Sequence, residues 1–236
     1  MCIALAVLVG CEAPPKISPG LSAVRIQVWA EPKTGYSPPP AGSAFAYDPV
    51  SRVPAADAPF ERVDYLGLDD IIVWVEPKAH SAQTPPAPAA TIDVSVPVKP
   101  GAEPIGVTSV GGQVTIRNRG RSDETIYSLS AGNEADLGSV PRGGIATLTC
   151  KQSGWIELLA ESQADPVAAI FVAPTPWVQR VRSGRKATFT DLPPGPCRVF
   201  CTHRRLPGSQ TSVELQPDQL GTTSLRVGVN ALPKVP

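Results

Sequence analysis

Apolar side chains recur along most of the chain in short stretches that suit β-strands. Residues 23–29 alternate apolar and polar side chains, as a half-buried strand does, whereas residues 71–75 are apolar on both faces, as in the interior of a sandwich. From Ile105 onward, stretches of about 5–8 residues follow one another with glycine- or proline-containing turns between them. The strands predicted there are residues 113–118, 125–129, 145–150, 155–160 and 167–172. This spacing is typical of a Greek-key sandwich.

A further set of short strands follows Pro174 and Pro176. These predicted strands are residues 177–181, 187–190, 196–202, 212–215 and 224–229. We interpret them as a second, smaller β-sandwich packed on the first. The chain has 28 prolines and 20 glycines against one methionine, a composition that favours strands and turns over long helices. The predicted fold class is therefore all-β.

The proline distribution suggests where the parts of the chain begin and end. Seventeen of the 28 prolines lie between Pro14 and Pro104, which is typical of extended or linker-like segments. We therefore predict four segments: a signal segment over residues 1–11, a proline-rich segment with one or more strands over 12–67, a central sandwich domain over 68–176, and a C-terminal β module with a tail over 177–236.

The charge balance argues against nucleic-acid binding. The chain carries 21 basic and 21 acidic side chains, so it lacks the excess positive charge that phosphate backbones attract. The charge is uneven, however, because residues 177–236 contain nine Lys or Arg and only three Asp or Glu, a formal charge of +6. No dense basic run occurs there, so we interpret this charge as a solvated strand surface, with an anion-binding patch as the alternative.

The N-terminus has the features of an export signal. The apolar run from Ile3 to Gly10 is too short to cross a bilayer, which takes about 20 helical residues. It ends in Leu8-Val9-Gly10-Cys11, which resembles the bacterial lipobox, so we predict lipidation at Cys11. The predicted partner is the membrane, and the predicted location is the bacterial cell envelope, facing the periplasm or the outer surface. Basic residues before the run are absent, which leaves open a start upstream of Met1 or an accidental cysteine.

Three stretches carry a resemblance to a known family: residues 114–138, residues 154–177 and residues 189–207, the last with the turn Leu192-Pro193-Pro194-Gly195. They resemble bacterial secreted cupredoxin-like proteins, labelled methylamine-utilisation or plastocyanin-like. Members of this family join a blue-copper-type sandwich to a small carboxypeptidase-regulatory-like β domain. The resemblance implies a cupredoxin-like Greek-key sandwich over residues 68–176 and a regulatory-like module over residues 177–236.

The resemblance also has an implication for copper binding. Such a site needs two imidazoles, one thiolate and usually an axial thioether, because copper prefers soft and borderline ligands. No Cys or His lies between Cys150 and Cys197, and the only methionine is Met1. The resemblance places the four ligand positions, in chain order, on Glu124, Ala160, Gln163 and Pro166. It therefore implies a degenerate, copper-free domain, and we predict no cofactor.

Other chemistry is sparse. The chain has two histidines, His80 and His203, and no glycine-rich phosphate loop, zinc-protease motif or nucleophile elbow. We therefore predict that it is not an enzyme. The predicted function is that of a non-catalytic, membrane-anchored lipoprotein with a binding or structural role. The alternative is a periplasmic redox or metal carrier that uses a rebuilt site of cysteines and His203.

Three cysteines beyond the lipobox leave the disulfide pattern open. Cys197 and Cys201 lie four residues apart on a predicted strand, about 13 Å at the extended rise, whereas a disulfide needs Cα atoms roughly 4.4–6.8 Å apart. They cannot pair with each other while that strand holds. Either Cys150 is bridged to one of them, which the exported location permits, or all three are buried thiols.

Overall fold

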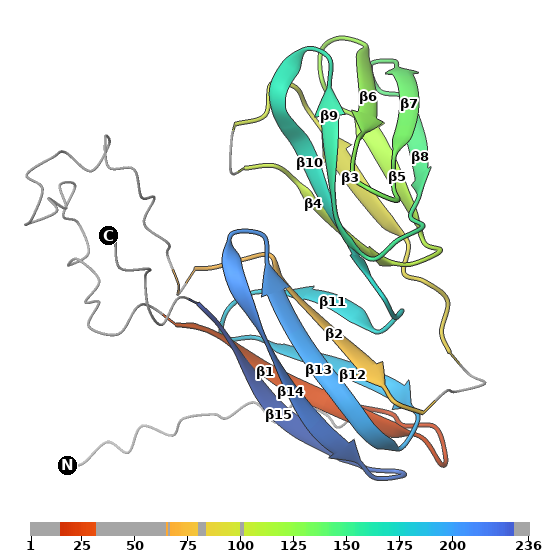
Figure 1. The fold of residues 1–236 in the computed structure, drawn as a ribbon, viewed down its shortest axis with the longest axis vertical. Coiled ribbons are helices and arrows are strands. Elements are labelled where there is room, and N and C mark those ends of the chain that lie inside the picture. The colour runs from red at the N-terminus through yellow and green to blue at the C-terminus, as the bar shows by residue number, and fades with distance from the viewer. Residues whose placement is uncertain (1–14, 32–64, 66, 80–83, 100–101, 229–236) are drawn as a thin grey trace, which may run out of the picture.

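The computed structural model describes residues 15–31, 65, 67–79, 84–99 and 102–228, and these residues form two β-sandwiches, one above the other in Figure 1. All fifteen elements of the described chain are strands. The predicted all-β class is confirmed. No helix in the described residues has the length and apolar character needed to cross a membrane.

The upper body in Figure 1, which we call the central sandwich, consists of eight strands in two sheets. One sheet has the order β4-β10-β9-β6-β7 and the other the order β3-β5-β8. The pairs β3/β5 and β4/β10 are parallel, and the other pairs are antiparallel. Its strands are β3 (Ala90–Val94), β4 (Ile105–Ser109), β5 (Gln113–Asn118), β6 (Glu124–Ser128), β7 (Ala135–Val140), β8 (Ile145–Thr149), β9 (Gly154–Ala160) and β10 (Gln163–Ala173).

The core of the central sandwich follows the alternation seen in the sequence. Within the predicted strands, the apolar positions predict an inner face of nine side chains, Leu129 and eight others. The eight others are buried: Val114, Ile116, Ile126, Leu148, Ile156, Leu158, Ile170 and Val172. The prediction is wrong for Leu129, which is 72% exposed. The reason is that β6 ends at Ser128, after alternation has pointed Ile126 and Ser128 inward. The next side chain therefore faces solvent.

The lower body in Figure 1, which we call the split sandwich, has seven strands in sheets of order β12-β1-β15 and β11-β2-β13-β14. Strand β1 pairs in parallel with β15 and antiparallel with β12, so it is the central strand of its sheet. The strands are β1 (Ser22–Glu31), β2 (Ile71–Pro77), β11 (Val178–Val181), β12 (Lys186–Leu192), β13 (Gly195–His203), β14 (Leu206–Leu215) and β15 (Leu220–Gly228).

The strand pairing corrects the predicted domain boundaries. Strand β2 was expected in the central domain, and the C-terminal module was expected to form from residues 177–236 alone. Instead β2 lies between β11 and β13, and β1 lies between β12 and β15. The inner faces of β1 and β2 share one core with Val199, which explains the pairing. The central sandwich is therefore an insertion between two strands of the split sandwich.

Candidate functional site

The corner predicted from the lost copper ligands is built around the side chain of Glu124. This residue is 5% exposed and begins β6. The hydroxyl of Ser122 donates to its Oε1 at 2.9 Å, and the hydroxyl of Ser162 donates to its Oε2 at 2.5 Å. The two serines come from the connections on either side, before β6 and after β9. Both oxygens of the side chain are thus hydrogen-bonded, as buried polar atoms usually are.

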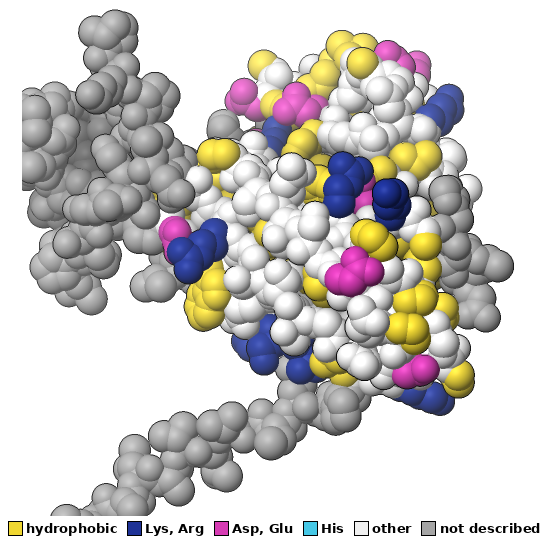
Figure 2. Space-filling view, turned by 60° about the horizontal axis from the view of Figure 1, so that its bottom comes forward, with side chains coloured by type: hydrophobic (Ala, Val, Ile, Leu, Met, Phe, Trp, Pro, Cys, Tyr) yellow, Lys and Arg dark blue, Asp and Glu magenta, His cyan; other side chains and the backbone are white. Residues whose placement is uncertain are grey.

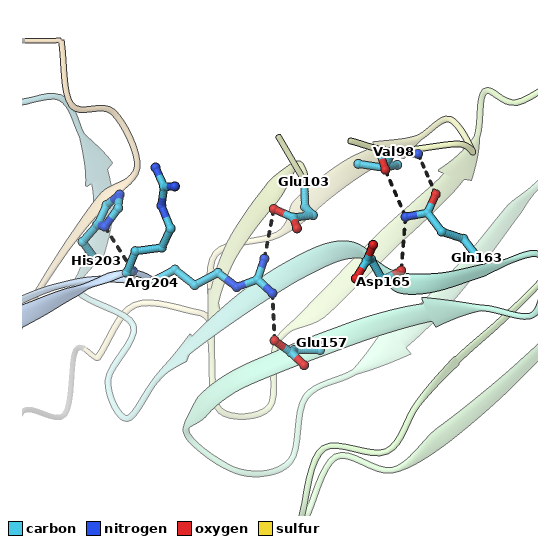
Figure 3. A network of polar contacts seen from close by, with 8 residues as sticks. Val98, Glu103, Glu157, Gln163, Asp165, His203 and Arg204 are labelled. Carbon is cyan, nitrogen blue, oxygen red and sulfur yellow. Dashed lines mark hydrogen bonds and ion pairs between the residues drawn. The ribbon is translucent and has the colours of Figure 1, made fainter. Parts of the chain in front are cut away.

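Ala160 and Gln163 lie at the same corner as Glu124. Ala160 is 1% exposed and pairs with Ile126, so its methyl group is part of the core. Gln163 pairs with Ala160 and connects β10 to the segment before β4: its Oε1 accepts from the Val98 N–H at 2.7 Å, and its Nε2 donates to the Val98 carbonyl at 3.0 Å (Figure 3). Both ends of this amide are occupied by backbone groups.

The fourth predicted position, Pro166, lies farther along β10. It is half-buried and falls within the register shift between Gln163 and Ala168, where β10 departs from regular pairing with β9. A proline has no N–H to give to the ladder, so an irregular stretch of strand accommodates it. Pro166 offers no donor atom for a metal from its side chain.

A buried asparagine supports the corner from β5. Asn118 is fully buried, and its Nδ2 donates to the carbonyls of Ser122 at 2.8 Å and Val140 at 2.9 Å. Its Oδ1 accepts from the Gly120 N–H at 2.8 Å. These bonds hold the loop that carries Ser122 against the end of β7. The hydroxyl is thereby positioned to reach Glu124.

The chemistry of this corner does not suit copper. It offers one carboxylate, hydroxyls and an amide, which are hard oxygen donors, where copper prefers imidazole and thiolate. Within the described ranges no three or more His, Cys, Asp or Glu side chains are grouped so as to hold a metal ion. The donor atoms that are present already take part in hydrogen bonds within the protein.

Sequence reasoning missed Ser122 and Ser162. A hydroxyl residue two positions before Glu124 was a usable local signal, since the two side chains share a face when the chain is extended. Ser162 gave no such signal, because its contact with Glu124 spans 38 residues and depends on the pairing of β6 with β9.

The three cysteines are buried, free thiols in two different cores. Cys150 belongs to the core of the central sandwich, while Cys197 and Cys201 belong to the core of the split sandwich. Burial raises the pKa of Cys150 and of Cys197 to about 11, and it raises the pKa of Cys201 as well. The thiolate, which is the form that binds metals, is therefore disfavoured at all three. Neither a Cys150–Cys197 nor a Cys150–Cys201 disulfide is present in the structure.

His203 serves the turn between β13 and β14. It is 8% exposed, and its Nδ1 accepts from the Arg205 N–H at 3.2 Å. Burial lowers the pKa of His203, the nearby Arg205 lowers it further, and Asp70 opposes both. A neutral imidazole that accepts at Nδ1 carries its proton on Nε2. The residue closes a tight turn, and within the described residues it belongs to no group of three or more possible metal ligands.

The neighbouring residue, Arg204, links the two sandwiches. Its guanidinium lies 3.2 Å from Glu103 and 2.7 Å from Glu157 of the central sandwich (Figure 3). The side chains of Arg204 and Glu103 are 22% and 10% exposed, so this pair is less screened by water than an ordinary surface pair. A second arginine, Arg180 of β11, donates to the Ile105 carbonyl at 2.6 Å.

A row of aromatic rings crosses the same junction. Phe171 of β10 packs against Trp155 and Trp74, with ring centroids 5.1 Å away in both pairs. Trp74 of β2 in turn stacks on Phe200 of β13, with centroids 4.9 Å apart. Ile72, Ala173 and Val178 are buried in the same apolar cluster. The two sandwiches are therefore joined by apolar packing as well as by ion pairs.

Comparison with known proteins adds little to this description. No family model matches the chain. No curated protein matches it either. Among solved structures, it resembles a methionine-to-alanine variant of amicyanin in the Cu(I) state, with 21% identity over 35% of this chain and 81% of that one, and with a TM-score of 0.28. A likeness of that strength carries no argument, so the sandwich architecture stands on the strand pairing alone.

Proposed function

We propose that this chain is a non-catalytic, exported protein, anchored to the bacterial envelope by lipid at Cys11, with a cupredoxin-like central sandwich that works without copper. Its role is binding or structural. The observation that carries the proposal is the corner at Glu124, where hydrogen bonds from Ser122 and Ser162 occupy the carboxylate that replaces a ligand.

The junction between the sandwiches supports a binding or structural role. Catalysis that depends on domain closure needs an interface that opens. Here Arg204 bridges Glu103 and Glu157, and the rings of Trp155, Phe171, Trp74 and Phe200 pack in a continuous row. Such an interface favours a two-domain body that presents fixed surfaces.

The alternative function, a redox or metal carrier, finds no matching arrangement within the part of the chain that the structure describes. A rebuilt copper site needs at least one thiolate close to an imidazole. Cys150 lies in one core, whereas Cys197 and Cys201 lie in the other, and burial raises the pKa of each thiol. His203 is held by the turn next to Arg205.

Copper titration tests the copper-free state. We expect the purified chain to stay colourless when Cu(II) is added, and to keep its melting temperature with either Cu(II) or a chelator. The reason is that a metal raises the melting temperature only if it binds the folded state tightly. The measurements are visible absorption and thermal unfolding at stoichiometric metal. A rise of several degrees that Glu124→Ala or Gln163→Ala abolishes would contradict the proposal.

Cell fractionation tests the anchor. Expressed with a competent export signal, the wild-type chain is expected in the membrane fraction, and Cys11→Ser is expected to be released or left unprocessed. The two or three acyl chains of a lipoprotein anchor hold a protein stably on the membrane. Without them, no comparable attachment remains. The matched control is Cys2→Ser, which removes the other N-terminal cysteine and should stay in the membrane fraction. Identical membrane recovery of wild type and Cys11→Ser would contradict the anchor.

A further inference from the structure

The outer face of the sheet β12-β1-β15 is polar, basic and without an acidic residue in its middle. The pairing register sets its side chains in rows across the three strands. Arg25 stands between Thr188 and Thr222, and Gln27 stands between Lys186 and Ser224. Trp29 stands beside Arg226 in the next row. The opposite face of β1 is buried in the core of the split sandwich.

Three cationic side chains give this face its charge: Arg25, Lys186 and Arg226. Arg226 forms an ion pair with Glu31 at 2.6 Å, at the end of the sheet. Arg25 is half-buried, and its Nε has no hydrogen-bond partner within the described structure. The face belongs largely to the segment with a formal charge of +6.

Trp29 adds an apolar group near one end of this polar surface, beyond the last residue pair of β1 with β12. It is 47% exposed, which makes it the most exposed tryptophan of the described chain. A tryptophan has an apolar ring system and one N–H donor, and it is enriched where a membrane meets water. Figure 2 shows Lys and Arg in several separate places on the side turned to the viewer, with apolar, Asp and Glu side chains among them, rather than in one dense basic patch.

We propose that the outer face of β12-β1-β15 rests on the anionic lipid headgroups of the membrane to which the chain is tethered. Lys and Arg interact with the headgroup charge, and Trp29 enters the interface. The inference builds on the proposed anchor, because only ten residues separate Cys11 from Ser22 at the start of β1. Ser18 and Gly20 of this segment donate to the carboxylates of Asp191 and Asp218, so its free part is shorter than the roughly 40 Å that the whole segment would span fully extended. The sheet containing β1 is thus kept close to the bilayer, which favours lipid over a soluble polyanion.

Vesicle binding tests this face separately from the anchor. The protein is residues 11–236 with Cys11→Ser, which keeps every described residue and has neither signal segment nor lipid. We expect it to sediment with vesicles of phosphatidylcholine mixed with phosphatidylglycerol, and not with phosphatidylcholine alone. Binding should weaken as salt shortens the Debye length from about 30 Å to about 10 Å.

Two charge-reversal variants test whether the contact with the vesicle lies on the sheet β12-β1-β15. Lys186→Glu removes one attraction and adds one repulsion, so we expect binding to fall by at least about tenfold. Lys151→Glu makes the same charge change after β8 in the central sandwich and should leave binding unchanged. In a second readout, the tryptophan emission of the wild type should shift to shorter wavelength on anionic vesicles, and Trp29→Phe should lose that shift.

The inference is overturned if the chain binds neutral vesicles equally well, if Lys151→Glu weakens binding as much as Lys186→Glu, or if it binds dextran sulfate but no vesicles. Failure here together with membrane recovery that depends on Cys11 would leave the anchor standing and reject only the docking face. Vesicle binding without Cys11-dependent recovery would support the face and reject the anchor.

Discussion

Phe171→Ala is expected to lower the free energy of unfolding by about 3–5 kcal/mol, the usual cost of removing a large buried ring. Phe171 is 6% exposed and packs between Trp155 of the central sandwich and Trp74 of the split sandwich. Its removal leaves a cavity at the junction, where two separately folded bodies have little freedom to collapse around it. Both the transfer energy and the cavity energy are therefore lost.

Urea unfolding followed by tryptophan fluorescence measures this effect, since Trp74 and Trp155 lie at the junction. The matched control is Leu129→Ala, which also removes a large apolar side chain, but one that is 72% exposed. We expect the control to change stability by no more than about 0.5 kcal/mol, as surface substitutions usually do. A loss below about 1 kcal/mol for Phe171→Ala would show that the aromatic row does not hold the sandwiches together.

The sequence pattern was a good guide to strands whose side chains alternate around a buried face. Residues 113–118 were predicted as a strand with the bounds that β5 has in the structure. Three strands were not predicted: β3, β4 and β7. Strand β7 contains Gly138, which adopts a positive φ of 66°, a backbone conformation more typical of turns than of strands. Pairing with β6 makes this segment a strand, and that pairing is a tertiary effect which local signals do not contain.

The periodicity of apolar residues could not predict the domain boundaries. An alternating or apolar stretch predicts a strand, but it does not indicate which other strand pairs with it in a sheet. Strand β1 pairs with β15, whose residues lie close to 200 positions later, so no local feature of β1 indicates its sheet. The predicted boundary before residue 68 is wrong, because β2 still belongs to the split sandwich and the chain enters the central sandwich only between β2 and β3. The insertion of the central sandwich became evident only from the pairing of β2 with β13.

At the site, the sequence predicted residue types better than contacts. The absence of Cys and His between Cys150 and Cys197 was sufficient to expect a corner without copper ligands. What occupies that corner was not predictable, because the bond from Ser162 to Glu124 depends on how the loop after β9 folds. The bridge from Arg204 to Glu103 and Glu157 was likewise missed, since it joins segments of two different sandwiches.

Residues 177–236 expressed alone are expected not to fold, in contrast to the independent module that the sequence suggested. In the structure β1 and β2 are internal strands of the two sheets of the split sandwich, and both lie outside this segment. Their removal leaves β12 apart from β15 and β11 apart from β13. It also takes six fully buried side chains out of the core: Val24, Ile26, Val28, Ile71, Val73 and Val75.

The burial free energy lost with β1 and β2 is large enough to prevent folding of residues 177–236. Fully burying a Val or Ile side chain contributes about 1.5–3 kcal/mol, so six of them contribute on the order of 10 kcal/mol, which is comparable to the whole stability of a domain. Circular dichroism and amide NMR spectra should therefore show an unfolded chain without a cooperative thermal transition. Residues 84–176 are the matched control and should fold, because all eight strands of the central sandwich lie within them. A cooperative transition for residues 177–236 would mean that β1 and β2 are accessory to a self-sufficient module.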